Sequence, residues 1–513
     1  MSLSRSIKKE AKRRTIRKSV LFISNMREQI LPLQPLCVWR FFYDICKIPH
    51  TSHNLEKISE YIINFAKERG LSYVKDKCGN ILIRKPATKG MEMRKGIIIQ
   101  SHIDMVGQKT HNSSHNFSTD PLTIFVDNGW VRAKDTSLGA DNGIGVAATL
   151  AILDNNEISH PEIEALFTTD EECGMEGATL LDKEFLKHSI MINTDSEEDN
   201  SAFIGCAGAI DFKASLNYTN EVCDIKGRAY KLTIRGLKGG HSGVDIHRGR
   251  GNANKLLVRF LNFCIQAYGI RISEIIGGDT RNAIPRYANA VVVVHENDCE
   301  DFLKEVTLFS RLYQSEYNII DDAVLIDCQE VNMPIGILPM EFQRKFINVI
   351  DATPDGVERM IPGIEDTVET SSNLAIVDCR DGKACVQILV RSTMNSRKYN
   401  YISSLWSLYS LVDAEVELFG DYPSWTPNLN SPILNIAKDF YKTSFGEDLK
   451  TKVMHAGLEC GVISSLYPNL DMISIGPNML HPHSPDERVE IASVEKFWNF
   501  LLGILKNSPE QSC

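Results

Sequence analysis

Short apolar runs rich in β-branched residues recur along this chain of 513 residues, and they alternate with stretches of helical periodicity. This alternation predicts an α/β fold built on a central sheet. Binding and catalytic residues in such folds gather at the C-terminal ends of the strands. Five polar segments follow apolar runs and carry acidic residues or histidines, so we expect them to meet at one edge of the sheet. They are residues 101–104, 139–143, 171–174, 193–195 and 481–487.

The periodicity also predicts where the elements of this sheet lie. Strands are expected over residues 80–84, 96–100, 163–168, 190–192 and 472–475, and helices over 36–42, 55–69 and 144–154. The middle of the chain differs and predicts an inserted α+β unit. Its expected strands are residues 230–235, 288–295, 385–390 and 415–418, with helices over 253–267 and 401–411.

The domain boundaries follow from this reading. We predict a basic, disordered tail over residues 1–29, a first part of the main domain over 30–208, the inserted unit over 209–423, and a second part of the main domain over 424–513. Residues 296–370 are charged and poor in motifs, and we expect them to be a helical extension of the insert. The basic tail could also be an organelle address, and Met26 is a sensible alternative start.

Composition excludes several classes of function. The net charge is −10, and no basic stripe with interleaved aromatic residues appears, which argues against nucleic-acid binding. No apolar run is long enough to span a bilayer, so we expect no membrane association. The 13 cysteines form no Cys-x-x-Cys pair and favour free thiols in a reducing cytoplasm.

The polar segments together hold three histidines (His102, His481 and His483) and several carboxylates. Each segment alone has an ordinary explanation, such as a turn, a helix cap or a solvated loop. Together they supply hard carboxylates and neutral imidazoles, which are the ligands of divalent metals. One shared carboxylate, with a histidine and a carboxylate on each side, would build two four-coordinate sites once a bridging water is added. Two metals so placed can clamp an attacking water and a carbonyl oxygen.

Neighbouring residues suit supporting roles at such a centre. Asp104 can hold the second ring nitrogen of His102, which fixes the tautomer of a ligating imidazole. Glu171 and Glu172 are adjacent, so one can bind metal while the other takes a proton from the activated water.

Longer motifs make the chain resemble the aminoacyl-histidine dipeptidases, also called cytosol nonspecific dipeptidases. These belong to a superfamily of co-catalytic zinc aminoacylases and carboxypeptidases. The resemblance runs from about residue 33 to residue 505 and leaves out only the basic tail. The matching stretches are residues 80–88, 136–145, 192–198, 236–243, 251–260, 281–286 and 455–461.

The resemblance implies two Zn²⁺ ions per subunit, with Co²⁺ or Mn²⁺ as substitutes. His102 and Asp195 would bind one ion, and Glu172 and His483 the other. Asp141 would bridge the two ions, and the peptide bond after it would be cis.

The same resemblance implies that Asp104 orients a ligand and that Glu171 is the general base. Asp170 precedes these glutamates, so Asp170 and Glu171 are an alternative pair for base and ligand. The spacing to the following Gly-Met favours Glu171 and Glu172. His481 competes with His483 in the same way, and the family pattern Pro-His-Ser-Pro-Asp-Glu selects His483.

The inserted unit would then be an enlarged lid domain. His241 would stabilise the oxyanion, in the superfamily often from the partner subunit of a dimer, which implies a homodimer through the lid. Arg391 would bind the C-terminal carboxylate of the substrate, a task that suits its bidentate guanidinium. Asn282 and Gly457 would line the substrate site, and His455 is either a substrate-site or a structural histidine.

The resulting hypothesis is a cytosolic two-zinc metallopeptidase that hydrolyses dipeptides of broad sequence, including Xaa-His dipeptides. One alternative is an aminoacylase or tripeptidase of the same superfamily. Another is a non-catalytic metal- or peptide-binding homologue.

Overall fold

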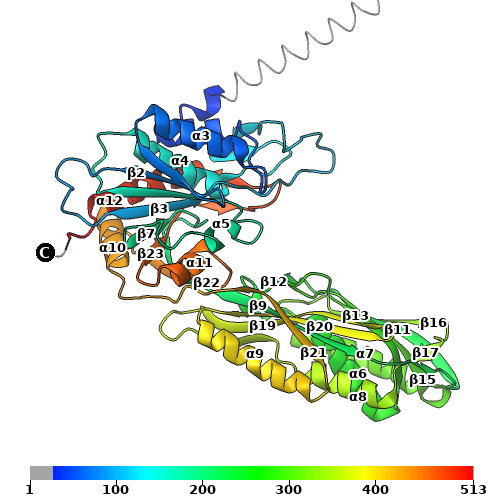
Figure 1. Ribbon diagram of the computed structural model, residues 1–513. Helices are drawn as coiled ribbons and strands as arrows, with labels where there is room; N and C mark the ends of the chain where they lie inside the picture. The colour runs from blue at the N-terminus through cyan, green and yellow to red at the C-terminus, as the bar shows by residue number, and fades with distance from the viewer. Residues whose placement is uncertain (1–26, 512–513) are drawn as a thin grey trace, which may run out of the picture. The chain divides into compact units, whose positions relative to one another are not determined.

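Residues 27–511 are described by the structure, a computed structural model, and they divide into two units (Figure 1). Unit 1 comprises residues 27–205, Pro427–Lys452 and residues 458–511, and unit 2 comprises Cys206–Thr426 and Val453–Gly457. The sequence predicted an insert over residues 209–423, without the short segment Val453–Gly457 that the structure groups with unit 2. Most of the predicted basic tail, residues 1–26, lies outside the described residues.

Unit 1 is built on an eight-stranded mixed sheet. Strands β6, β3, β7 and β23 are neighbours in it and run parallel, so their C-terminal ends lie at the same edge. In spatial order the strands are β1 (Ser72–Lys75), β2 (Ile81–Lys85), β6 (Ile163–Thr168), β3 (Ile97–His102), β7 (Ile190–Asn193), β23 (Asp471–Ser474), β8 (Ser201–Cys206) and β22 (Lys450–Met454). Central strands β3 and β6 are buried throughout, which explains their continuous apolar sequences.

Helices and a small second sheet complete unit 1. The helices are α2 (Leu36–Ile45), α3 (Glu56–Glu68), α4 (Ala140–Asp154), α5 (Glu176–Thr179), α10 (Pro432–Phe445), α11 (Glu459–Leu466) and α12 (Ile491–Lys506). The four-stranded sheet contains β24 (Met479–Leu480), β25 (Arg488–Glu490), β5 (Trp130–Ala133) and β4 (Ile124–Asp127). Within the described residues, no helix is both long and apolar enough to cross a membrane.

Helix α4 packs tightly because its first turns carry glycines. A Cβ added at Gly145 would lie 2.0 Å from Asn142 Oδ1 and 2.2 Å from Thr194 Oγ1. Only glycine leaves room for this approach, so the first turn of α4 can lie directly against the segment that follows β7.

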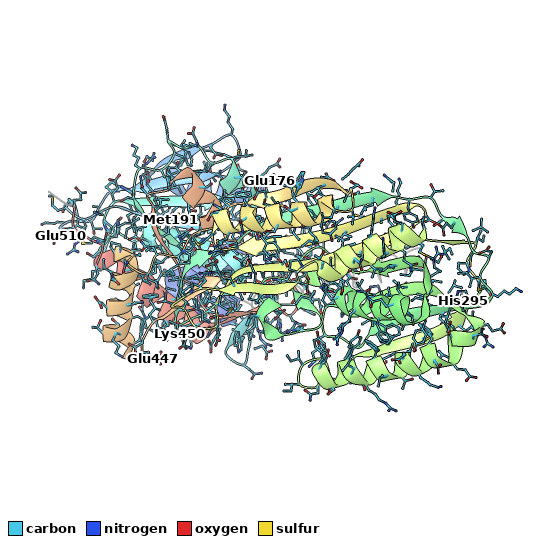
Figure 2. All side chains as sticks on the ribbon, turned by 90° about the horizontal axis from the view of Figure 1, so that it is seen from below. Glu176, Met191, His295, Glu447, Lys450 and Glu510 are labelled. Atoms are coloured by element: carbon cyan, nitrogen blue, oxygen red, sulfur yellow. The ribbon has the colours of Figure 1, made fainter. Side chains whose placement is uncertain are left out.

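Unit 2 is an antiparallel sheet with helices on one face (Figures 1 and 2). Its main strands, in spatial order, are β16 (Leu325–Val331), β11 (Gly227–Arg235), β15 (Ala288–His295), β13 (Arg271–Gly277), β19 (Val368–Arg380), β20 (Lys383–Ser392), β9 (Gly208–Asn217) and β21 (Glu415–Tyr422), and β18 (Gly356–Met360) pairs with β19. The covering helices are α6 (Ala253–Tyr268), α7 (Cys299–Glu316), α8 (Met340–Ala352) and α9 (Asn395–Ser410). Two short ribbons pair β10 (Glu221–Val222) with β17 (Gly336–Ile337) and β12 (Gly240–His241) with β14 (Ala283–Ile284).

Alternation along the strands separates the two faces of this sheet. Ile210 and Phe212 of β9 point into the apolar core that the helices cover. Arg391 of β20 is paired with Ala209, the residue next to Ile210 in β9. Because successive side chains of a strand point to opposite faces, Arg391 lies on the face away from this core.

The predicted fold class, an α/β domain with an inserted α+β unit, is confirmed, but the helical reading of residues 296–370 is wrong in part. This stretch contains α7 and α8 and also β16, β18 and the start of β19. Strand β16 lies at an edge of the sheet and carries charged residues, so it lacks an apolar run. The first half of β19 is polar although it is buried, so its hydrophobic pattern does not predict a strand.

Candidate active site

Four of the five polar segments follow neighbouring parallel strands of unit 1. His102 is the last residue of β3, Glu171 and Glu172 come three and four residues after β6, and Asp195 comes two residues after β7. His483 follows β23 by way of the short strand β24. Because these strands are parallel neighbours, their ends bring together side chains that are far apart in sequence.

Asp141 joins these side chains from a helix, so the expectation that all five polar segments lie at strand ends was wrong for the segment 139–143. It does not follow a strand of the main sheet but lies in the first turn of α4. The preceding strand, β5, belongs to the small four-stranded sheet. The peptide bond between Asp141 and Asn142 is cis, as the resemblance implied.

The two carboxylate oxygens of Asp141 face different histidines. Its Oδ1 lies 3.1 Å from His102 Nε2, and its Oδ2 lies 3.2 Å from His483 Nε2. His102 Nε2 is also 3.0 Å from Asp195 Oδ1, and His483 Nε2 is 3.0 Å from Glu172 Oε1. The side chains thus form two groups, each with one imidazole and one carboxylate of its own, and both groups share Asp141.

These groups fit divalent cations. Two ligand atoms of one tetrahedral zinc ion lie about 3.3 Å apart, close to the separations around each imidazole. The donors are imidazole nitrogens and carboxylate oxygens, as zinc accepts. Burial raises the pKa of Asp195 to about 7. The two groups also hold more carboxylates (Asp141, Asp195 and Glu172) than imidazoles (His102 and His483). A bound cation would supply the missing positive charge.

Asp104 ties the ligands to their supporting loops. Its Oδ1 lies 3.4 Å from His102 Nδ1, the ring nitrogen that faces away from Asp141. The same carboxylate accepts the backbone N–H groups of Glu171 and Glu172 at 3.0 and 3.1 Å and the hydroxyl of Ser52 at 2.8 Å. Asp104 is therefore placed to orient the ring of His102 and to hold the turn that carries Glu171 and Glu172, called here the glutamate turn.

The competing assignments differ in geometry. Glu171 lies with His102 and Glu172 in one cluster, and burial raises its pKa well above the ordinary value. Asp170 instead lies beside His53. His483, and not His481, faces Asp141 and Glu172.

Two buried glutamates support this site and were given no role by the sequence analysis. Glu487 accepts the N–H groups of Leu138, Gly139 and Ala140 at 2.7–3.1 Å and so holds the loop that carries Asp141. Glu459 accepts hydrogen bonds from Gln100 and Thr168, and burial raises its pKa to about 8. Glu487 lies within the polar segment 481–487 and Glu459 within the matching stretch 455–461. A motif alone does not show what a carboxylate contacts.

The predicted lid residues belong to unit 2, and three of them share a polar cluster there. Arg391 Nη1 donates to Tyr422 Oη at 2.9 Å, and Arg391 Nε donates to Ser242 Oγ at 3.4 Å. Gly457 packs against the Tyr422 ring, and a Cβ added there would lie 3.0 Å from that ring. His241 precedes Ser242 directly.

His241 is held in one tautomer. Its Nδ1 accepts the backbone N–H groups of Gly243 and Val244, both at 3.1 Å. Burial, together with the nearby Arg391 cation, lowers the pKa of His241 to about 4. The neutral ring therefore carries its proton on Nε2, where it can donate a hydrogen bond.

Asn282 and His455 are placed differently. The side chain of Asn282 is exposed, whereas its backbone carbonyl oxygen accepts the backbone N–H of Ser242 at 2.8 Å. His455 is buried, and its Nε2 pairs with Ser371 Oγ at 2.7 Å. Ser371 lies in the polar half of β19 that the sequence analysis missed.

A cluster of imidazoles and carboxylates at the C-terminal edge of an α/β sheet is typical of metal-dependent hydrolases. A family model described as peptidase family M20/M25/M40 matches residues 98–507, so the chain belongs to this family of peptidases.

Individual relatives are similar over nearly the whole chain. A cytosol non-specific dipeptidase of Escherichia coli (strain K12) is 43% identical over 94% of this chain and 99% of its own length. The crystal structure of an aminoacylhistidine dipeptidase from Vibrio alginolyticus superposes with a TM-score of 0.88 at 41% identity, over 94% of this chain and 99% of that one. An aminopeptidase PepT from Bacillus cereus shares the fold, with a TM-score of 0.53 at 14% identity over 92% of this chain and 98% of its own.

Proposed function

We propose that this protein is a two-zinc dipeptidase of broad specificity that includes Xaa-His dipeptides among its substrates. The observation that carries the proposal is the shared carboxylate of Asp141, whose two oxygens face His102 and His483 in separate ligand groups. The names of the two relatives above 40% identity, both dipeptidases, support the substrate class.

The proposed cations would be held by His102, Asp141 and Asp195 on one side and by Asp141, Glu172 and His483 on the other. When bound, they supply Lewis acidity toward the scissile carbonyl and lower the pKa of a water molecule.

The chain's own groups perform the remaining steps of the proposed reaction. Glu171 takes the proton of the attacking water and passes it to the leaving amine, for which its raised pKa is suited. His241 donates from Nε2 to the oxyanion, and Arg391 binds the C-terminal carboxylate of the substrate. Asn282 and Gly457 are proposed to line the substrate site.

The proposal extends to the setting of the reaction. Zinc is preferred because imidazole and carboxylate suit it, although Co²⁺ and Mn²⁺ accept the same ligands. A cytoplasmic location agrees with the free cysteines and with the name of the relative from E. coli. A homodimer through the lid domain also belongs to the proposal and rests on the resemblance.

The test is an activity panel on metal-stripped and metal-restored protein. We expect dipeptides, including Xaa-His, to be cleaved only after metal is restored, and N-acyl amino acids and tripeptides to be cleaved poorly. Preference for either of those two classes would favour the aminoacylase or tripeptidase alternative. A protein that takes up metal and cleaves nothing in the panel would be a non-catalytic homologue.

A further inference from the structure

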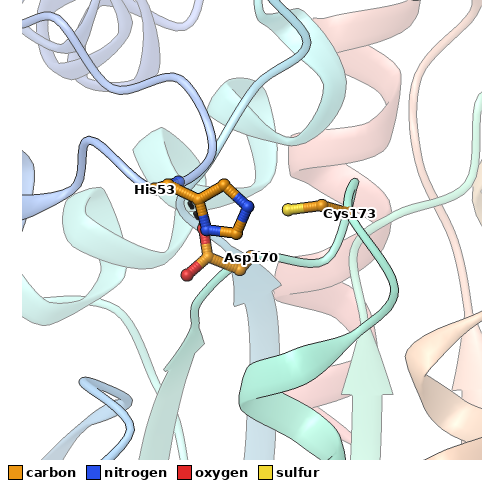
Figure 3. A group of neighbouring side chains, drawn as sticks. All are labelled: His53, Asp170 and Cys173. Atoms are coloured by element: carbon orange, nitrogen blue, oxygen red, sulfur yellow. Dashed lines mark hydrogen bonds and ion pairs between the residues drawn. The ribbon is translucent and has the colours of Figure 1, made fainter.

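A third group of potential metal ligands lies outside the two-cation centre. It consists of His53, Asp170 and Cys173 (Figure 3), whose ligand atoms all lie within 4.8 Å of one another. His53 Nδ1 is 3.6 Å from Asp170 Oδ1, and the sulfur of Cys173 points toward the imidazole of His53. None of the three has a role in the proposed reaction.

The two segments that carry this group are fastened to each other. The backbone N–H of His53 donates to Asp170 Oδ1 at 2.6 Å. Beside it, Ser52 donates to the carboxylate of Asp104, which also accepts the N–H groups of Glu171 and Glu172. The three side chains therefore start from backbone that the structure already holds in place, so a ligand would not have to bring the segments together.

The three donors suit a thiophilic cation. Imidazole, carboxylate and thiolate are all zinc ligands, and a thiolate favours Zn²⁺, Co²⁺ or Cd²⁺ over Mg²⁺ or Ca²⁺. The 3.6 Å separation of His53 and Asp170 is near the roughly 3.3 Å expected for two ligands of one tetrahedral ion. His53 and Cys173 are exposed, so small rotations of their side chains can close the group around an ion that arrives from solvent.

We propose that His53, Asp170 and Cys173 form a third, exchangeable site for a thiophilic divalent cation such as Zn²⁺. Three protein ligands leave a fourth position to water, which favours weaker and reversible binding. On binding, the Cys173 thiol releases its proton to solvent and the sulfur donates an electron pair to the cation. No oxidation or reduction is involved.

The site has a consequence for hydrolysis that rests on the proposed function. Asp170 and Cys173 flank Glu171 and Glu172 in one turn. A cation that draws Asp170 and Cys173 toward His53 would restrain this turn and shift the proposed base. Excess zinc should therefore inhibit hydrolysis through this site.

Binding of Co²⁺ to the proposed third site can be measured without measuring peptide hydrolysis. Protein loaded with two equivalents of Zn²⁺ per chain is titrated with Co²⁺, and the near-ultraviolet absorption of a thiolate–cobalt bond is followed. The ligands proposed for the two-cation centre include no sulfur, so cobalt that exchanges there adds nothing to this band. We expect the band to saturate at one further equivalent, to vanish in Cys173→Ser and to need at least tenfold more Co²⁺ in His53→Gln.

Matched variants separate this site from other thiols and exposed histidines. Cys223→Ser in unit 2 and His111→Gln in an exposed loop should leave the cobalt band unchanged. The absence of the band from the unaltered protein, or its persistence in Cys173→Ser, would overturn the site.

Measurements of hydrolysis rate test only the proposed inhibition by excess Zn²⁺. Excess Zn²⁺ should lower dipeptide hydrolysis by the unaltered protein and spare Cys173→Ser. Equal inhibition of both would refute the regulatory consequence. If no variant hydrolyses any peptide, the proposed function fails while the cobalt titration still decides the site.

Discussion

At the scale of single residues, the position of Asp141 determines what the candidate centre can do. A carboxylate with one oxygen toward each of two histidines can join two cations at the short distance that a bridging water requires. Glu171 and Glu172 are adjacent in sequence but differ in surroundings, because only Glu172 pairs with His483. Neighbouring residues of one type can therefore carry different roles.

Replacing Glu171 by alanine should separate metal binding from catalysis. We expect Glu171→Ala to retain both metal equivalents and to lose about 10²- to 10⁴-fold in kcat, the range for a general base. Metal content by elemental analysis and kcat on a dipeptide check this. Near-normal turnover would contradict the assignment of the base.

His483→Ala should lower the metal content instead. The imidazole of His483 lies against Asp141 and Glu172, so its loss removes one of the three ligands of the second cation. Elemental analysis after dialysis should show close to one equivalent. His481→Ala is the matched control and should keep two, and the reverse result would transfer the ligand role to His481.

At the scale of elements, loops at the ends of strands and helices hold the centre, and buried carboxylates hold the loops. Glu487 binds three consecutive N–H groups before Asp141, and Asp104 binds the two N–H groups of the glutamate turn. The ligand geometry is thus set by residues that need not touch a metal themselves.

Glu487→Ala tests this support. Without its carboxylate the loop that carries Asp141 loses three hydrogen bonds, and we expect metal affinity to fall by about 10- to 100-fold. Competition with a chelator measures the affinity. The neighbouring variant Asp486→Ala removes an exposed carboxylate that is paired with Arg132 and should leave the affinity unchanged. Equal effects of both variants would contradict the argument.

At the scale of the whole molecule, the chain separates an α/β unit that carries the candidate metal ligands from an antiparallel unit with its own apolar core. Unit 2 holds one buried and one half-buried neutral histidine, because loss of solvent lowers the pKa of His455 to about 3 and that of His241 to about 4. Acid should therefore destabilise unit 2 through these groups.

The pH dependence of unit 2 follows from these values. Between about pH 6.5 and pH 4 the unfolded chain binds more protons at both histidines than the folded unit does, so the free energy of unfolding falls as the pH falls. Each histidine contributes up to about 1.4 kcal/mol per pH unit. Denaturant unfolding followed at several pH values should show a smaller slope in His455→Gln. An unchanged slope would show that His455 is protonated in the folded state.

The sequence by itself determined the α/β class, the inserted unit and the motifs of the peptidase family, because hydrophobic periodicity and long motifs are local properties of the chain. It did not determine the polar, buried half of β19, the edge strand β16, or the place of Asp141 in a helix, since neighbouring strands and helices decide which side of a segment is covered. Only the tertiary structure brought the ends of β3, β6, β7 and β23 together, and with them two groups of ligands around one carboxylate. Distances across a sheet depend on the order of its strands, and no single segment of the sequence determines that order.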